Sequence, residues 1–335
     1  MSENFHVLLK IVRYMDVEGF RISKNTPVSQ LAAQMSLAGF SATELGRGVQ
    51  VIRAMKKDKA LVILAFTSNM ISSGLRETIA ELCRKKFVDV IVTGIGSVEE
   101  DIIKIRMPFL LSEFRQDDAA LHRDGINRIG NILVPNDRYE FLEKVAFEFY
   151  GEIFERFKER RPNGKFRAVI SPSGLVRELG LFAQKKFNKN KKEKKALERS
   201  WVFWAAKNNI SVVLPAPVDG ALGLQLAFFR QDRDLVIDVA DDLRKVGAMV
   251  NSAKKVGGII LGGGFAKHHA IALNILRGGL DYAVYVSTGT QHDGSMTGAR
   301  VNEAVSWGKV SSKARTAYVE GDATVIFPIM IAPFL

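Results

Sequence analysis

Seven short apolar segments recur along the chain, and helical periodicity follows most of them. Each segment has the length and apolar character of a strand that is buried on both faces, and the stretch after it begins with small residues. The predicted strands are 60–66, 88–93, 166–171, 210–216, 256–264, 281–288 and the first part of 315–332, whose second part is predicted as a helix. Apolar strands that alternate with helices predict an α/β, Rossmann-like fold, with a mostly parallel sheet and helices on both faces.

The chain of 335 residues shows neither an internal repeat nor a Pro-, Ser- or Gly-rich linker. A chain of this length suits one large domain or two modest ones, and we predict a single large domain. No uncharged apolar run reaches the ~18–20 residues of a membrane span. The charged first 16 residues do not have the pattern of a signal peptide, so we expect no membrane association.

The single cysteine, Cys83, excludes an internal disulfide framework and a cysteine-cluster metal site. Its spacing in "RETIAELCRKKFVDV" (76–90) puts it on the apolar face of a helix, which predicts a core position. This cysteine usage favours a cytoplasmic location.

The net charge is +12, and a large part of it comes from "KKFNKNKKEKK" (185–195), with seven lysines and one glutamate. This run is either a solvated loop or helix end, or a surface that steers an acidic partner or nucleic acid. Aromatic residues do not alternate with its lysines, so base stacking is not expected. We therefore expect no nucleic-acid partner.

The loops after the predicted strands are rich in Gly, Ser, Thr and Asp. In a parallel α/β sheet these loops meet at one edge, where ligands bind. Glycine lets the backbone approach a phosphate and helix N-termini bind anions, so a dinucleotide is the natural ligand. The usual fingerprint is incomplete, because "GIGSVE" (94–99) has Glu99 where the third glycine belongs.

Titratable residues gather in these predicted loops, together with Trp307. They are Glu99, Glu100, Asp219, His268, His269, Asp293, Glu303, Lys309 and Asp322. Converging carboxylates suit a hard cation such as Mg²⁺, or else the ammonium groups of an amine beside an indole face. We favour the amine and expect no metal.

Lys309 ends the stretch "EAVSWGK" (303–309). It is either an ordinary surface lysine or a nucleophile that attacks the imine made when a nicotinamide cofactor oxidises an amine. His268 and His269 are either one buried and one exposed helix residue, or a proton shuttle.

Six segments carry a strong resemblance to the deoxyhypusine synthase family, and the resemblance extends over nearly the whole chain. They are "TSNMISSGLR" (67–76), "GSVEEDIIK" (96–104), "GINRIGNILVPN" (125–136), "SWVFWAAKNNISVVLPAPVDGALG" (200–223), "ILGGGFAKHHAIALN" (260–274) and "DYAVYVSTGTQHDGSMTGARVNEAVSWGKV" (281–310). The motifs GGG-x-x-KHH and EAVSWGK are highly specific to it.

The resemblance implies NAD-dependent transfer of the aminobutyl group of spermidine to a lysine of the translation initiation factor 5A precursor, through an imine on an enzyme lysine. It also implies a homotetramer whose active sites are shared across a dimer interface. The implied organisation is an N-terminal helical extension over 1–30 and an NAD-binding α/β domain over 31–335.

The family's functional residues fall on matching positions of this chain. The implied catalytic residues are Lys309, as imine former, and His268, in proton transfer. The implied NAD contacts are Ser68, Asn69, Met70, Ile71, Ser72, Gly94, Ile95, Gly96, Glu100, Asp219, Gly263, Thr288, Gly289, Asp322 and Ala323. The implied polyamine contacts are Glu99, Glu100, His268, Gly294, Ser295, Glu303, Trp307 and Lys309.

Three positions depart from the family pattern. Leu224 and Met296 stand where the family has acidic residues that grip the polyamine, and Ala272 stands where it has asparagine. Each lost charge-assisted contact is worth roughly 1.5–3 kcal/mol. Three interpretations remain open: deoxyhypusine synthesis with a divergent polyamine end, aminobutyl transfer to a small amine as in homospermidine synthases, and a non-catalytic NAD-binding subunit.

Overall fold

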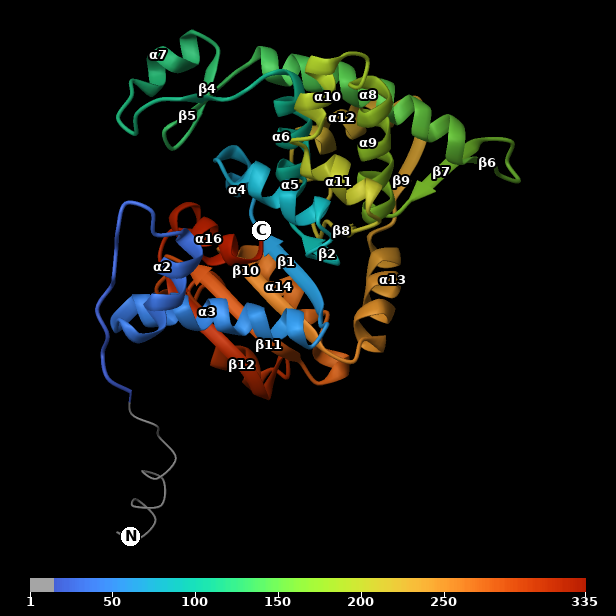
Figure 1. Ribbon diagram of the computed structural model, residues 1–335. Coiled ribbons are helices and arrows are strands. Elements are labelled where there is room, and N and C mark those ends of the chain that lie inside the picture. The colour runs from blue at the N-terminus through green and yellow to red at the C-terminus, as the bar shows by residue number, and fades with distance from the viewer. Residues whose placement is uncertain (1–14) are drawn as a thin grey trace.

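The structure is a computed structural model that describes residues 15–335. Its centre is a six-stranded sheet in the order β12-β11-β10-β1-β2-β8, with every neighbouring pair parallel (Figure 1). The strands are β1 (Leu61–Phe66), β2 (Val90–Val92), β8 (Ser211–Val213), β10 (Val256–Leu261), β11 (Leu280–Ser287) and β12 (Val310–Glu320). The predicted α/β class, with a parallel sheet between helices, is confirmed.

Side chains of each central strand alternate between two hydrophobic cores. In β1, Val62, Leu64 and Phe66 join one core, whereas Ile63 and Ala65 join the other. The first core is covered by α3 (Phe40–Lys57), α5 (Arg76–Arg84), α11 (Trp201–Lys207) and α16 (Ala323–Ile331), and the second by α13 (Val239–Ser252), α14 (Gly264–Ala272) and α15 (Val301–Ser306). Burial on both faces explains why β1, β10 and β11 are continuously apolar.

The predicted strand 166–171 does not join the central sheet. It forms β7 (Phe166–Ile170), which pairs antiparallel with β6 (Lys158–Arg160) and parallel with β9 (Asp234–Ile237). A third sheet, on the other side of the molecule in Figure 1, joins β3 (Leu110–Leu111), β5 (Ile132–Pro135) and β4 (Ile126–Ile129). The sequence predicted the strand β7 but neither of the two small sheets.

The remaining helices surround the sheets. They are α2 (Val28–Gln34), α4 (Asn69–Ser72), α6 (Ile95–Arg106), α7 (Asp118–Arg123), α8 (Asp137–Phe157), α9 (Pro172–Lys186), α10 (Lys191–Leu197) and α12 (Ala221–Phe229), with short 3₁₀ turns at Met35–Leu37, Ile275–Arg277, Gln291–Asp293 and Ala332–Phe334. Cys83 is fully buried in α5, as predicted, and the lysine run 185–195 covers the end of α9 and the start of α10. No helix among the described residues is long and apolar enough to span a membrane.

The N-terminal extension predicted over 1–30 falls partly outside the described residues. Within the described part, residues 15–27 form no helix, and α2 begins at Val28.

Asp101 ties three helices to one another. It is fully buried on α6, accepts a hydrogen bond from Nε of Arg76 on α5 at 2.7 Å, and lies 2.5 Å from the hydroxyl of Ser200, the N-cap of α11. Because its carboxylate is paired and hydrogen-bonded, this burial is tolerated. The network fixes α6, whose first turn belongs to the predicted site.

Candidate active site

The loops that follow the central strands share one edge of the sheet, as parallel strands require. The strand order reverses between β1 and β10, because the chain continues outward from β1 to β2 and β8 on one side and from β10 to β11 and β12 on the other. Residues 67–72 follow β1, and residues 262–264 follow β10. The predicted nucleotide contacts therefore flank the topological switch point, where α/β sheets bind nucleotides.

The backbone of these loops is packed too closely for side chains. A Cβ on Gly263 would lie 2.2 Å from Cα of Thr297, and one on Gly96 would lie 3.0 Å from Cβ of Ser68. Gly94 and Gly263 are the N-caps of α6 and α14, and neither helix has a side-chain cap. Their first N–H groups remain available to a pyrophosphate, so this edge fits a dinucleotide.

Glu99 and Glu100 lie in the second turn of α6, and both are buried. Glu99 accepts a hydrogen bond from the backbone N–H of Leu222 at 2.9 Å, and burial raises its pKa. Glu100 accepts a hydrogen bond from the Ser72 hydroxyl at 2.6 Å, and burial raises its pKa to about 7. Ser72 belongs to α4, so this bond joins the loops after β1 and β2.

The other predicted nucleotide contacts lie at the same edge. Asp219 is exposed before α12, and Asp322 caps α16 by accepting a hydrogen bond from the backbone N–H of Thr324 at 2.8 Å. Thr288 and Gly289 follow β11, where the backbone N–H of Gly289 donates to the Ser287 hydroxyl at 3.0 Å. The structure thus brings the whole predicted nucleotide set to one edge of the sheet.

Lys309 lies in a cavity of about 230 Å³ on the sheet face covered by α14 and α15. Its side chain is only 7% exposed, and Nζ lies 5.0 Å from the centre of the Trp307 ring. Among the described residues, Nζ of Lys309 makes no hydrogen bond or ion pair within bonding distance. Predicted partners His268, Glu303 and Trp307 line the same cavity.

Two cavity residues, Lys267 and Tyr285, were not assigned a role from the sequence. Lys267 is 1% exposed, donates a hydrogen bond from Nζ to the carbonyl of Ala299 at 2.6 Å, and lies 4.6 Å from the centre of the Tyr285 ring. Burial lowers the pKa of Lys267 to about 8, against the opposing effect of Glu303. The Tyr285 hydroxyl is buried and has no hydrogen-bond partner among the described residues. The signal for Lys267 was its place in the GGG-x-x-KHH motif.

The structure does not bring all predicted polyamine contacts together. Glu99 and Glu100 do not line the Lys309 cavity, and Gly294 and Ser295 lie exposed in the loop before it. The expectation that Lys309 lies in a loop after a strand is wrong. Lys309 precedes β12, and its carbonyl accepts a hydrogen bond from the backbone N–H of Leu280 at the start of β11.

The three departures occupy different places. Met296 is half-buried and lines the Lys309 cavity, whereas Leu224 is 55% exposed on α12 and Ala272 ends α14. Glu303 is the carboxylate that lines this cavity, beside Lys267, Arg300 and Lys309. Across residues 15–335, no group of three or more His, Cys, Asp or Glu residues is arranged to hold a metal ion.

The family model described as deoxyhypusine synthase matches residues 30–334. A "probable deoxyhypusine synthase" of Pyrococcus furiosus is 42% identical over 94% of this chain and 93% of its own length. Another of Thermococcus onnurineus is 44% identical over 88% of this chain and 86% of its own length. The chain therefore belongs to the deoxyhypusine synthase family, as the sequence motifs predicted.

A solved structure shows the same fold. The crystal structure titled as that of "a putative deoxyhypusine synthase from Entamoeba histolytica" superposes with a TM-score of 0.64 at 24% identity, over 95% of this chain and 96% of that chain.

Proposed function

We propose that this protein transfers the aminobutyl group of spermidine to one lysine of the translation initiation factor 5A precursor and so forms deoxyhypusine, with NAD as cofactor. Membership of the family supports this activity. The observation that carries the residue assignment is the buried Lys309 amine, which faces Trp307 and makes no ion pair within the described residues.

NAD would be held at the edge of the sheet by residues of six loops. They are Ser68, Asn69, Met70, Ile71, Ser72, Gly94, Ile95, Gly96, Glu100, Asp219, Gly263, Thr288, Gly289, Asp322 and Ala323. Bound NAD would accept a hydride from the amine in the first step and return it in the last. The uncapped starts of α6 and α14 would hold its pyrophosphate.

In the proposed reaction, the Lys309 amine adds to the C=N carbon of oxidised spermidine. The bond to the original nitrogen breaks, and 1,3-diaminopropane leaves with that nitrogen. The acceptor lysine then adds to the same carbon and displaces Lys309, which regains its free amine. His268, on α14 at the cavity, would move the proton between the incoming and leaving nitrogens.

Trp307 and Glu303 would hold the cationic chain of the donor. Trp307 is 68% exposed at the cavity and offers a ring face to an ammonium or methylene group. Glu303, Glu99, Glu100, Gly294, Ser295 and His268 complete the proposed polyamine contacts. Because its protein substrate acts in translation, we place the reaction in the cytoplasm.

A second candidate is aminobutyl transfer to a small amine, which Met296 favours. Met296 lines the Lys309 cavity at a position that the family fills with a carboxylate. A thioether cannot pair with an ammonium group, so a donor or acceptor with fewer charges fits this part of the cavity better.

The proposed assembly is a homotetramer with active sites shared between subunits. None of the residues that line the Lys309 cavity belongs to the proposed NAD set. A second copy of the chain can supply the nucleotide that reaches Lys309, and this gives the two groups of residues one reaction centre.

The test is a transfer assay with the full-length protein, NAD, spermidine labelled in its aminobutyl group, the initiation factor, and putrescine as a competing small-amine acceptor. We expect label on the factor, loss of transfer in Lys309→Ala, and unchanged NAD binding in that variant. Lys313→Ala is the matched control, because Lys313 is an exposed lysine on β12. Label on putrescine but not on the factor would favour the second candidate, and normal transfer by Lys309→Ala would exclude the role of Lys309.

A further inference from the structure

A second basic segment, distinct from the lysine run at 185–195, forms the β6–β7 hairpin. The stretch "FKERRPNGKFR" (157–167) holds five basic residues and one acidic residue. Its turn is closed by a hydrogen bond from the backbone N–H of Arg161 to the carbonyl of Lys165 at 2.8 Å, and Gly164 takes a positive φ of 79°. The hairpin projects from the molecule beyond α8 (Figure 1).

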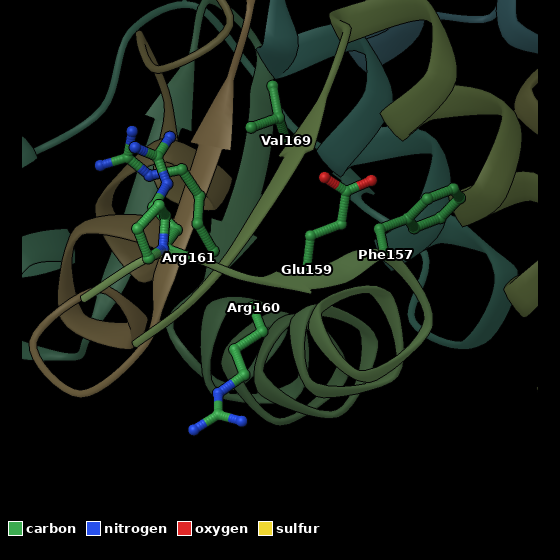
Figure 2. A pocket seen from close by; sticks show the side chains of 7 residues that line it. Phe157, Glu159, Arg160, Arg161 and Val169 are labelled. Carbon is green, nitrogen blue, oxygen red and sulfur yellow. The ribbon is translucent and has the colours of Figure 1, made fainter. Parts of the chain in front are cut away.

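Two hollows flank this hairpin, and both are lined by Arg161 and Arg167. The first, of about 380 Å³, is also lined by Phe157, Glu159, Arg160, Pro162 and Val169. In Figure 2, Arg160 points away from Glu159 and Val169, so cations reach both sides of the hairpin. The second hollow, of about 660 Å³, continues to Arg230 and Arg233 after α12.

Most of these cations are not neutralised by a nearby carboxylate. Arg160, Arg161, Lys165 and Arg233 make no ion pair within the described residues, whereas Arg167 and Arg230 both pair with Asp234. The hydrogen bond from Arg167 lowers the pKa of Asp234, and Arg230 and Arg161 add to this effect. Asp234 therefore stays charged and, with Glu159 in the first hollow and Asp232 in the second, neutralises part of the cluster, but basic residues still outnumber acidic ones in both hollows.

Aromatic rings interleave with these cations, unlike in the run 185–195. Phe166 is 46% exposed on β7, and Nζ of Lys158 lies 5.2 Å from the centre of its ring. Phe157, half-buried, lines the first hollow, and Phe166 lines the second. Exposed aromatic faces among arginines are the combination that binds unpaired bases and their phosphates together.

We propose that the β6–β7 hairpin, with the α12–β9 connection, is a binding surface for single-stranded RNA. The guanidinium groups contact the phosphates, and Phe166 provides a stacking face for a base. An acidic protein would satisfy the charges but gives no reason for an exposed phenylalanine between them. The surface is separate from the Lys309 cavity and does not depend on the proposed function.

The test measures fluorescence anisotropy of a short fluorescein-labelled oligouridylate with the full-length protein over a series of salt concentrations. The charge variant is the triple substitution Arg160→Ala, Arg161→Ala and Lys165→Ala. Its matched control is Lys191→Ala, Lys192→Ala and Lys194→Ala, which removes the same charge from exposed positions of α10. The stacking variant is Phe166→Leu, which keeps an apolar side chain.

We expect the charge variant to bind the oligonucleotide at least tenfold more weakly. The magnitude of its slope of log binding constant against log salt concentration should be smaller by about 2, since each of the three lost phosphate contacts contributes ~0.7. Phe166→Leu should weaken binding about fivefold or more. The α10 control should bind nearly as the parent. Three outcomes would each overturn the proposal. The first is an equal loss of RNA affinity in the hairpin and α10 variants, and the second is displacement of the bound oligonucleotide by polyglutamate as effectively as by RNA. The third is no binding of RNA by the parent protein.

Discussion

Lys309 and Lys267 line the same cavity, but different contacts hold their amines. Lys267 is fixed by the Ala299 carbonyl at 2.6 Å, whereas Nζ of Lys309 has the Trp307 ring 5.0 Å away and no acceptor within bonding distance among the described residues. A nucleophile needs a lone pair that is free to attack, and an amine tied to a carbonyl is less able to move. The contacts therefore favour Lys309 over Lys267 as the reacting lysine.

Lys267 should make stability depend on pH in an unusual direction. Burial lowers its pKa from 10.5 to about 8, so between these values the unfolded state binds more protons than the folded state. Stability from this group therefore rises with pH across that interval. We expect the free energy of unfolding of Lys267→Met, relative to the parent, to fall by about 2–3 kcal/mol between pH 8 and pH 10.5.

Urea unfolding at several pH values measures this difference. Lys254→Met is the control, because Lys254 is exposed and makes no ion pair within the described residues. A difference between Lys267→Met and the parent that stays constant with pH would contradict a lowered pKa at Lys267.

Glu100 should make the stability of the protein fall as the pH rises, opposite to the effect of Lys267. Burial raises its pKa from 4.5 to about 7, so the folded state keeps a proton that the unfolded state releases. Stability from this group is lost as pH rises from 4.5 to 7. Glu100→Gln, which resembles the protonated acid, should be more stable than the parent by ~2 kcal/mol or more at pH 8 and nearly equal to it at pH 5.

Unfolding of the protein without NAD, followed in urea at both pH values, checks this expectation. Glu113→Gln, at an exposed carboxylate, should show no such change between pH 5 and pH 8. If Glu100→Gln is equally stable relative to the parent at both pH values, the Glu100 carboxyl is not desolvated as described.

At the scale of elements, the glycines that begin helices at the candidate site are needed for close packing. A Cβ on Gly263 would lie 2.2 Å from Cα of Thr297, whereas a Cβ on Gly247, within α13, would have no other group within 4 Å. Gly263→Ala should lower stability by about 1–3 kcal/mol through overpacking. Gly247→Ala should raise it by about 0.5–1 kcal/mol, since alanine favours the helix.

Thermal or urea unfolding of the two variants measures whether each substitution raises or lowers the stability of the protein. A stabilising Gly263→Ala would mean that the loops after β10 and β11 can separate without loss, and that their close approach does not shape the site.

The elements that the sequence predicted well are those buried on both faces. Strands β1, β10 and β11 follow continuous apolar runs, and their helices begin where glycine or small polar residues follow. The run 166–171 looked similar, but β7 has the exposed residues Phe166 and Val169, because it belongs to a small sheet at the surface. Sheet membership depends on pairing with distant segments such as β9, and local periodicity does not contain that information.

Strand β12 shows the same limit at its start. It begins at Val310, five residues before the predicted segment, and its first half includes exposed polar side chains because β12 is an edge strand. This difference moves Lys309 from an expected loop to the beginning of a strand. The motif identified the lysine as a candidate, but the pattern of the surrounding residues did not give its position.

At the scale of the whole molecule, the candidate site divides into two places on one chain. The proposed NAD contacts lie where the central strands end, and Lys309 lies beside Leu280, where β11 starts. The cavity still adjoins this edge, because Met296 lines the cavity and the neighbouring Thr297 lies against Gly263 of the proposed NAD set. Since no residue of the proposed NAD set lines the cavity itself, we propose that another subunit supplies the nicotinamide that serves Lys309.

This arrangement predicts complementation between two inactive chains. Lys309→Ala removes the reacting amine, and Asp219→Ala alters an exposed residue of the proposed NAD set without disturbing the core. Each variant alone should lose most transfer activity. When the two chains are co-expressed, mixed assemblies that join the Lys309 of one chain to the intact NAD loops of another should regain a substantial part of it.

Co-expression with two different affinity tags, tandem purification and the transfer assay measure this recovery, and light scattering gives the size of the assembly. Mixtures of separately purified chains that do not exchange subunits are the control for additive residual activity. If each active site is built from one chain alone, every site of the mixed assembly carries one of the two substitutions. Activity no higher than that of the control would therefore show that Lys309 and the NAD contacts of a site belong to the same subunit. Recovery above it requires that the carboxyl edge of one sheet and the Lys309 cavity of another meet across a subunit interface.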